Sequence, residues 1–177
     1  IFNFGDGVDT ILDTASAAAP NTLQFGPSIT PGMLSLGLGS LLIRVGAAGD
    51  AVHLDTFNPD DAHGRHGVGR FVFADGTVLS YEDLLARGFD LTGTAANDTI
   101  TGTNVADRID GAGGNDLPMG GAGSDTYIFG AGSGQDLIRE AAASADTDTL
   151  QVLANPANVS VTREADNLVV SLTGTSD

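Results

Sequence analysis

The chain of 177 residues lacks cysteine and tryptophan, and only seven of its residues are lysine or arginine. Without cysteine, neither a disulfide nor a thiolate metal site can form. Its 23 acidic residues give a formal net charge of −16, which repels nucleic acid and anionic membrane surfaces. The sequence also lacks a long hydrophobic run, since the longest, around residues 36–45, is broken by glycine and too short to span a bilayer. We therefore expect no nucleic-acid partner and no membrane insertion.

What the sequence does contain is a run of four nonapeptides between Gly93 and Ile128: GTAANDTIT, GTNVADRID, GAGGNDLPM and GGAGSDTYI. Each has an aspartate at its sixth position, namely Asp98, Asp107, Asp116 and Asp125. The first six residues of each repeat suit a tight turn and the last three a short strand. Two nonapeptides would then complete one coil of a flattened solenoid. The alternative is a flexible loop rich in glycine, asparagine and aspartate, which would not require so strict a spacing.

Aspartates at this spacing suit calcium, which takes about six to eight oxygen ligands from carboxylates and carbonyls. One turn supplies only part of that number, so turns two nonapeptides apart must share a cation. We predict that Asp98 shares a site with Asp116 on one edge, and Asp107 with Asp125 on the other. Asp136 follows in an irregular turn and is expected to offer its carboxylate to Asp116, making Asp116 the most sensitive position. Asp125 has only Asp107 as an expected partner, because no nonapeptide follows it in register.

The nonapeptides resemble the calcium-binding repeats of the repeats-in-toxin (RTX), or haemolysin-type calcium-binding, proteins. The match is uneven, because Gly114 and Gly123 stand at the fourth position of the last two repeats but Ala96 and Val105 in the first two. The stretch FVFADGTVLSYEDLL at 71–85 resembles the haemolysin-type calcium-binding related region that accompanies such repeats. The resemblance implies Ca²⁺ as the bound cofactor. The predicted metal-site residues are Asp9, Gly93, Asn97, Asp98, Gly102, Asp107, Gly111, Gly113, Gly114, Asn115, Asp116, Gly120, Gly121, Gly123, Asp125, Gly132, Gly134 and Asp136.

The two ends of the chain repeat each other without a gap. Phe2 returns as Phe129, 127 residues later, and Asp50 returns as Asp177 at the same separation. Asp9 is the equivalent of Asp136 in this alignment. So long an internal repeat predicts that the chain comes from a tandem array, in which neighbouring units cover each other's ends.

Outside the nonapeptides, short alternating runs predict strands at 22–25, 33–36, 41–45, 51–54 and 69–73, and a hairpin of 159–163 with 168–172. One helix is predicted at Tyr81–Arg87, where Ser80 and Asp83 can form a capping box and Gly88 ends the helix. The predicted fold class is all-β, a parallel β-roll (a calcium-binding β-solenoid) with a flanking β-rich unit and one short helix. We expect the β-rich unit over 1–90, starting with the end of a preceding β-roll block. The β-roll would follow over 91–138, and the next copy of the β-rich unit would start at 139–177.

Other polar clusters do not form a catalytic pattern. His63 and His66 lie in a glycine-rich segment without a third ligand at a known spacing, which favours a solvated loop over a transition-metal site. The acidic pair Asp60–Asp61, and the pair Asp146 and Asp148, accompany no nucleophile or base. We interpret them as solvated loops or peripheral calcium contacts, and we expect the chain not to be an enzyme.

These features predict a secreted calcium-binding structural module from a tandem RTX array, such as an adhesin, extracellular-matrix, surface-layer or filament protein, that folds on binding external calcium. The alternative is a calcium-dependent folding and secretion segment of a larger RTX toxin or secreted hydrolase whose activity lies outside this chain. The long repeat favours the first. The resemblance implies a bacterial protein exported by type I secretion to the medium or cell surface. The expected partners are calcium ions and, through open solenoid ends, further copies by end-to-end self-association or neighbouring repeats.

Overall fold

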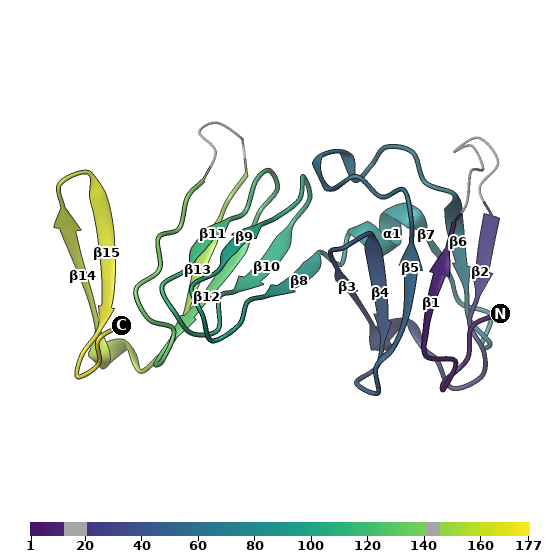
Figure 1. The fold of residues 1–177 in the computed structure, drawn as a ribbon, viewed down its shortest axis with the longest axis horizontal. Coiled ribbons are helices and arrows are strands. Elements are labelled where there is room, and N and C mark those ends of the chain that lie inside the picture. Colours follow the sequence, from purple (N-terminus) through teal and green to yellow (C-terminus); the bar gives the residue numbers. More distant parts are fainter. Residues whose placement is uncertain (13–20, 141–145) are drawn as a thin grey trace. The chain divides into compact units, whose positions relative to one another are not determined.

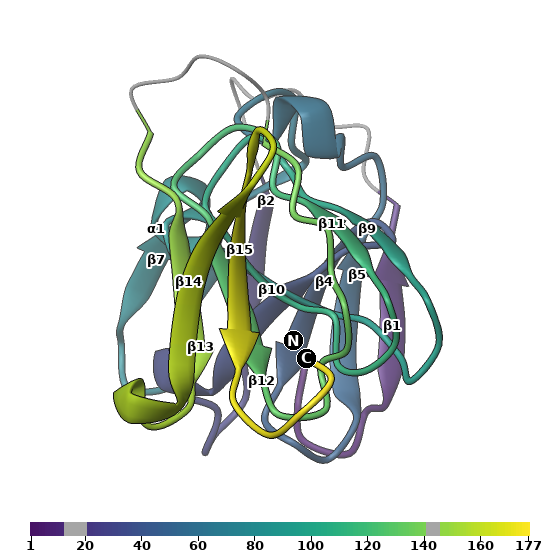
Figure 2. The same ribbon diagram turned by 90° about the vertical axis from the view of Figure 1, so that its left-hand side faces the viewer.

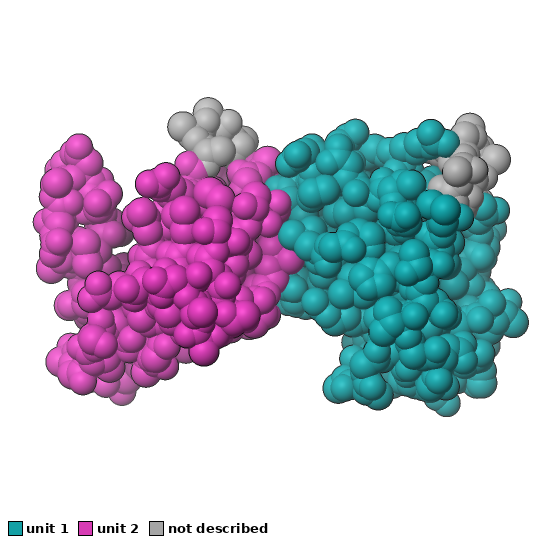
Figure 3. Space-filling view, viewed as in Figure 1, with its two compact units in different colours: residues 1–90, 103–106 teal, residues 91–102, 107–177 magenta. Residues whose placement is uncertain are grey.

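The computed structural model describes residues 1–12, 21–140 and 146–177, and consists mostly of β-strands with one short α-helix (Figure 1). The chain is therefore all-β, as predicted. Its described part divides into two compact units (Figure 3). Unit 1 comprises Ile1–Asp90 and Thr103–Ala106, and unit 2 comprises Leu91–Gly102 and Asp107–Asp177. The three-part division at residues 90 and 138 stays a prediction.

Unit 1 contains two groups of paired strands. In the first, β1 (Val8–Ile11) pairs in parallel with β5 (Asp50–Leu54), which is followed by antiparallel β4 (Leu41–Val45) and β3 (Leu34–Gly37). β3 also meets the start of β8 (Phe89–Thr92) in parallel. In the second, β6 (Val68–Val72) lies between parallel β2 (Asn21–Gln24) and antiparallel β7 (Val78–Ser80). Because these sheets are mixed, the predicted parallel β-roll is not confirmed for the chain as a whole.

The core of unit 1 is aromatic and aliphatic. Phe25 and Phe73 stack with ring centroids 5.0 Å apart, and Phe71 beside them is fully buried. The helix α1 (Tyr81–Leu85) adds Leu84, which is also fully buried. Burial of side chains of this size contributes about 1.5–3 kcal/mol each, so unit 1 has a conventional hydrophobic core.

The predicted capping box begins α1. The Ser80 hydroxyl accepts a hydrogen bond from the Asp83 N–H at 3.1 Å, and the Ser80 N–H donates to the Asp83 carboxylate at 2.9 Å. The helix ends at Leu85, two residues before the predicted end, and Gly88 follows with φ +75°. Short 3-10 helices occupy Pro31–Met33 (η1), Pro59–Asp61 (η2) and Pro156–Asn158 (η3).

In unit 2 each nonapeptide supplies one strand: β9 (Thr99–Thr101), β10 (Asp107–Asp110), β11 (Leu117–Met119) and β12 (Thr126–Gly130). β9 pairs in parallel with β11, and β10 pairs in parallel with β12. Successive repeats thus alternate between two sheets. β13 (Thr149–Leu153) adds to β12 in parallel, and β14 (Val159–Glu164) forms an antiparallel hairpin with β15 (Asn167–Leu172) that is visible in both views (Figures 1 and 2).

The 127-residue repeat is also a repeat of structure. The Asp50 carboxylate accepts the N–H groups of Gly5 at 2.9 Å and Gly7 at 3.1 Å. The equivalent Asp177 carboxylate accepts those of Gly132 at 2.9 Å and Gly134 at 3.0 Å. We call each of these arrangements a glycine–aspartate clasp. The parallel bridge from Phe2 to Phe25 likewise returns in the pairing of Phe129 with Val152.

Candidate metal centre

Three aspartates stack along the first edge of the nonapeptide stretch. The Asp98 N–H donates to the Asp116 carboxylate at 2.8 Å, and the Asp116 N–H donates to the Asp136 carboxylate at 2.9 Å. Asp116 and Asp98 lie 18 residues apart, which is the spacing of two nonapeptides. Asp116 therefore lies between two others, and the irregular turn still delivers Asp136 to this edge.

The second edge also carries three stacked aspartates. The Asp107 N–H donates to the Asp125 carboxylate at 2.8 Å, and the Asp125 N–H donates to the Asp148 carboxylate at 3.1 Å. The expectation that Asp125 has Asp107 as its single partner is wrong, because the segment before β13 supplies another carboxylate. A sequence signal existed: like Asp125, Asp148 is followed by threonine and then a large apolar residue.

Two carboxylate oxygens at these edges are buried without a partner. Asp116 and Asp125 are 3% and 1% exposed, and Oδ2 of each has no hydrogen-bond partner within the described ranges. By contrast, Oδ2 of Asp98 accepts the Thr94 N–H at 2.6 Å and the Thr94 hydroxyl at 2.8 Å. A buried, unpaired carboxylate oxygen is costly, so these two positions fit a bound cation.

The pKa values of the aspartates follow this burial. Burial raises the pKa of Asp125, and the neighbouring carboxylates of Asp148 and Asp146 raise it further, against a lowering by the Asp107 N–H. Burial likewise raises the pKa of Asp136. The N–H and hydroxyl groups of Thr94 instead lower the pKa of Asp98. The charged forms of Asp125 and Asp136 are thus disfavoured in the folded protein without a cation.

Mild acid is therefore expected to favour folding of the calcium-free protein. A folded-state pKa raised above 3.8 means that ionised Asp125 and Asp136 destabilise the fold at neutral pH. This destabilisation is relieved as the pH falls from neutrality through the raised pKa values towards 3.8. In EGTA, the circular-dichroism signal of β-structure should rise between pH 7 and about pH 5. Asp125→Asn, which cannot ionise, should show a smaller rise, and an unchanged signal in the wild type would contradict the assignment.

The first glycine of each nonapeptide makes room for the aspartate of the same repeat. A Cβ atom at Gly102, Gly111 or Gly120 would collide with the carboxylate of the aspartate five residues later. At Gly93 it would lie 3.0 Å from the Asp98 carboxylate and 2.5 Å from the Gly111 carbonyl oxygen. These glycines are required for close approach, and this explains why the sixth-position carboxylates can fold back under their own turns.

The other predicted residues have varied surroundings. Asn97 accepts the Asn115 N–H at 2.9 Å, and Asn115 accepts the Gln135 N–H at 3.0 Å, so these side-chain oxygens join successive turns. The Gly113 N–H donates to the Thr94 carbonyl, and the Gly123 N–H to Asp146. Positive φ angles occur at Gly114, Gly121, Gly123, Gly132 and Gly134. The last two form the clasp around Asp177, and Asp9 is exposed on β1 in unit 1.

A group of three carboxylates lies at the second edge. Ligand oxygens of Asp125, Glu140 and Asp148 all lie within 4.8 Å of one another. The Tyr127 hydroxyl donates to Glu140 and accepts the Gly120 N–H at 2.7 Å, which orients this side of the group. Glu140 was not predicted from the sequence. Its one signal is the acidic residue at the equivalent place in the 127-residue alignment, Asp13.

The three histidines have three different neighbours. His53 contacts the Ser40 hydroxyl at 2.6 Å, and exposed His63 contacts Glu82 at 2.8 Å. The ring of His66 stacks on Tyr81 with centroids 3.9 Å apart. His63 and His66 are thus engaged with other side chains, in agreement with the interpretation of this segment as a loop without a transition metal.

Comparison with known proteins places one segment of unit 1 in a family. No curated protein matches the chain at a significant level. Within the described ranges, there is no helix with the length and apolar character needed to span a membrane. Residues 41–83, which run from β4 into α1, match the model of the haemolysin-type calcium binding protein related domain. This match supports the relationship of the chain to the RTX, or haemolysin-type calcium-binding, family that the nonapeptides indicate.

Proposed function

We propose that the chain is a secreted, calcium-binding structural module that folds on meeting external calcium. The observation that carries this proposal is the pair of buried, unpartnered oxygens, Oδ2 of Asp116 and Oδ2 of Asp125. They occupy the same position in consecutive nonapeptides, one on each edge. A protein of net charge −16 that buries such oxygens needs cations to complete its fold.

In this proposal the nonapeptide stretch winds as a parallel β-roll. Support comes from the parallel pairing of alternate repeats, with Ile100 opposite Pro118 and Ile109 opposite Tyr127. The turns stack in the same register, since the Leu117 N–H donates to the Asp98 carbonyl at 2.8 Å. Such stacking brings carboxylates and turn carbonyls from two coils to one edge, as a shared cation site requires.

The donor set fits calcium better than magnesium. Asp98, Asp116 and Asp136 would hold cations on the first edge, and Asp107, Asp125 and Asp148 on the second, with Glu140 beside them. All of these offer hard oxygen atoms from several backbone segments. Calcium accepts irregular shells of about six to eight oxygens, whereas magnesium demands a tight octahedron and retains its waters.

We further propose that the module acts in a tandem array of an adhesin, matrix, surface-layer or filament protein, and that it is not itself an enzyme. The support is the repetition of sequence, clasp and bridge at 127 residues, since repeat proteins gain stability and length from stacked copies. Secretion belongs to the proposal through the relationship to RTX proteins.

Tyrosine-sensitised terbium luminescence tests this function directly, because terbium occupies calcium sites and the chain has no tryptophan and two tyrosines. Tyr127 lies beside the carboxylate group and Tyr81 lies on α1 in unit 1. We expect emission that calcium, but not equal magnesium, displaces. Tyr127→Phe should abolish the emission and the matched Tyr81→Phe should retain it. Emission that calcium fails to displace would refute the proposed site.

A further inference from the structure

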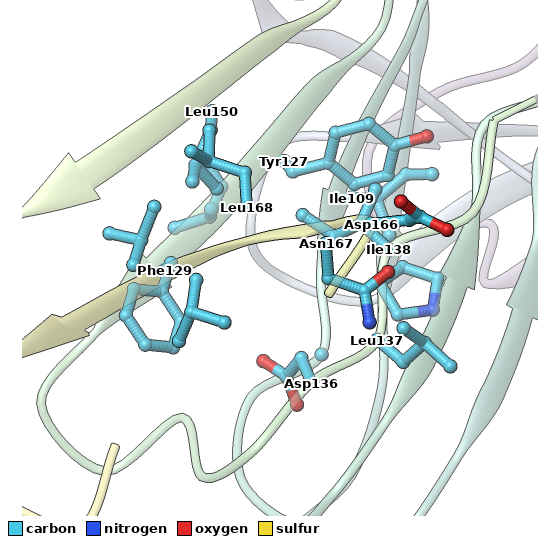
Figure 4. Close-up of a pocket in the computed structure, with 15 residues that line it drawn as sticks. Ile109, Tyr127, Phe129, Asp136, Leu137, Ile138, Leu150, Asp166, Asn167 and Leu168 are labelled. Carbon is cyan, nitrogen blue, oxygen red and sulfur yellow. The ribbon is translucent and has the colours of Figure 1, made fainter. Parts of the chain in front are cut away.

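Unit 2 carries an open apolar groove between the nonapeptide strands and the β14–β15 hairpin (Figure 4). Its volume is about 430 Å³. Its apolar lining includes Ile109, Tyr127, Phe129, Leu150, Leu168 and Val170. The carboxylates described above are not needed to explain this surface, and an apolar surface left in water indicates an interaction site.

The internal repeat shows that the equivalent surface in unit 1 is covered. Apolar residues of β13, β14 and β15 are more exposed than their equivalents 127 residues earlier. The exposed fractions are 37% at Leu150 against 7% at Leu23, 58% at Val161 against 5% at Leu34, and 73% at Leu168 against 1% at Leu41. The same positions of the repeat are therefore core in one unit and surface in the other.

In unit 1 the cover comes from the segment that follows Asp50. β6 adds to β2 and sets Phe71 opposite Leu23. β5 adds to β4 and sets Leu54 opposite Leu41. In the described part of unit 2, β13 pairs with β12 alone and β15 with β14 alone. The strand edges that β6 and β5 occupy in unit 1 are thus open in unit 2.

The start of the covering segment is already in place in unit 2. In unit 1, Asp50 is held by the clasp with Gly5 and Gly7 and is the first residue of β5. Asp177 is held in the same way by Gly132 and Gly134. A chain running on from this clasp with the sequence of β5 would begin where the open edge of β15 needs a strand.

We propose that the groove of unit 2 is the docking site for a further copy of residues 51–90, which adds strands to the free edges of β15 and β13 and covers their apolar face. The partner is thus defined chemically as a segment of two strands and a short helix. It would place the equivalents of Leu54 and Phe71 against Leu168 and Leu150. The groove is an interface between consecutive copies of the repeat.

The test extends the full chain with its own residues 51–90, joined directly after Asp177 so that the repeat continues in register. Amide hydrogen exchange is measured in β13 and β15 in millimolar calcium. The extension should slow exchange there by about tenfold or more, and should abolish binding of an apolar dye to the groove. The control carries the same extension with Leu54→Asn and Phe71→Asn in the added copy alone. It should protect neither strand, while the exchange of unit 1 stays unchanged in both proteins.

Two outcomes would overturn the proposal. Exchange in β13 and β15 that is as fast with the extension as without it would show that the segment does not dock. Protection of these strands in a dimer of the unextended chain, seen by light scattering, would show that a second whole chain occupies the groove instead. Neither outcome depends on which carboxylates bind calcium, so failure here is distinguishable from failure of the proposed function.

Discussion

Removal of calcium with EGTA is expected to unfold the nonapeptide stretch of unit 2, and millimolar calcium, but not equal magnesium, is expected to restore it. The interior of this stretch holds the buried carboxylates of Asp107, Asp116 and Asp125. Without a cation these charges are left in a poorly hydrated site. Circular dichroism and hydrogen exchange followed along the chain should show loss of protection in β9 to β12.

The expected size of the effect comes from mass action. Extracellular calcium modules have dissociation constants of about 10⁻⁴–10⁻³ M. At about ten times that concentration each site stabilises the fold by about 1.4 kcal/mol. Three sites would contribute about 4 kcal/mol, comparable with the about 5–15 kcal/mol of a whole domain. Unit 1, with its phenylalanine core, serves as the internal control, and full protection of β9 to β12 in EGTA would contradict calcium-dependent folding.

Asp116→Ala and Asp125→Ala are expected to be the most damaging single substitutions at the two edges. Each residue lies in the middle of three stacked aspartates and carries a buried oxygen without a partner. Its loss should weaken two neighbouring sites together and shift the calcium midpoint of folding by about tenfold or more. Asp98→Ala lies at the end of its stack, where Thr94 already satisfies the second oxygen, and should shift the midpoint less.

Asp166→Ala is the matched control for these variants. It removes the same charge from the exposed turn of the β14–β15 hairpin, where Asp166 meets only Arg163 at 3.5 Å in the interactions resolved there. Calcium titrations of all four variants, followed by the β-structure signal, give the comparison. Equal shifts for Asp98→Ala and Asp125→Ala would contradict the shared-carboxylate arrangement.

The sequence was most informative where a period determines the contact. A nine-residue period with alternate strands in two sheets requires that residues 18 apart are neighbours, and Asp98 with Asp116 and Asp107 with Asp125 follow from it. The capping box of Ser80 and Asp83 was equally readable, because both of its hydrogen bonds are local. In both cases the partner lies at a fixed distance along the chain.

Contacts outside a period could not be predicted in this way. Asp148 reaches Asp125 across 23 residues, a separation that no repeat in the sequence specifies. In unit 1, alternation of apolar residues identified the strands, but it carries no information on which strands pair, or in which direction. The parallel β1–β5 and β2–β6 pairs beside antiparallel ones were therefore found only in the structure.

The glycine–aspartate clasps also bear on how a long array could fold. Each clasp joins residues 43 and 45 positions apart, in unit 1 and again in unit 2. Further copies would add more closures of this length and would not lengthen any of them, so the entropy of closing each loop stays constant as the array grows. Contact order relative to chain length would then fall with every added copy, and folding could proceed from one end, copy after copy, at a rate independent of total length.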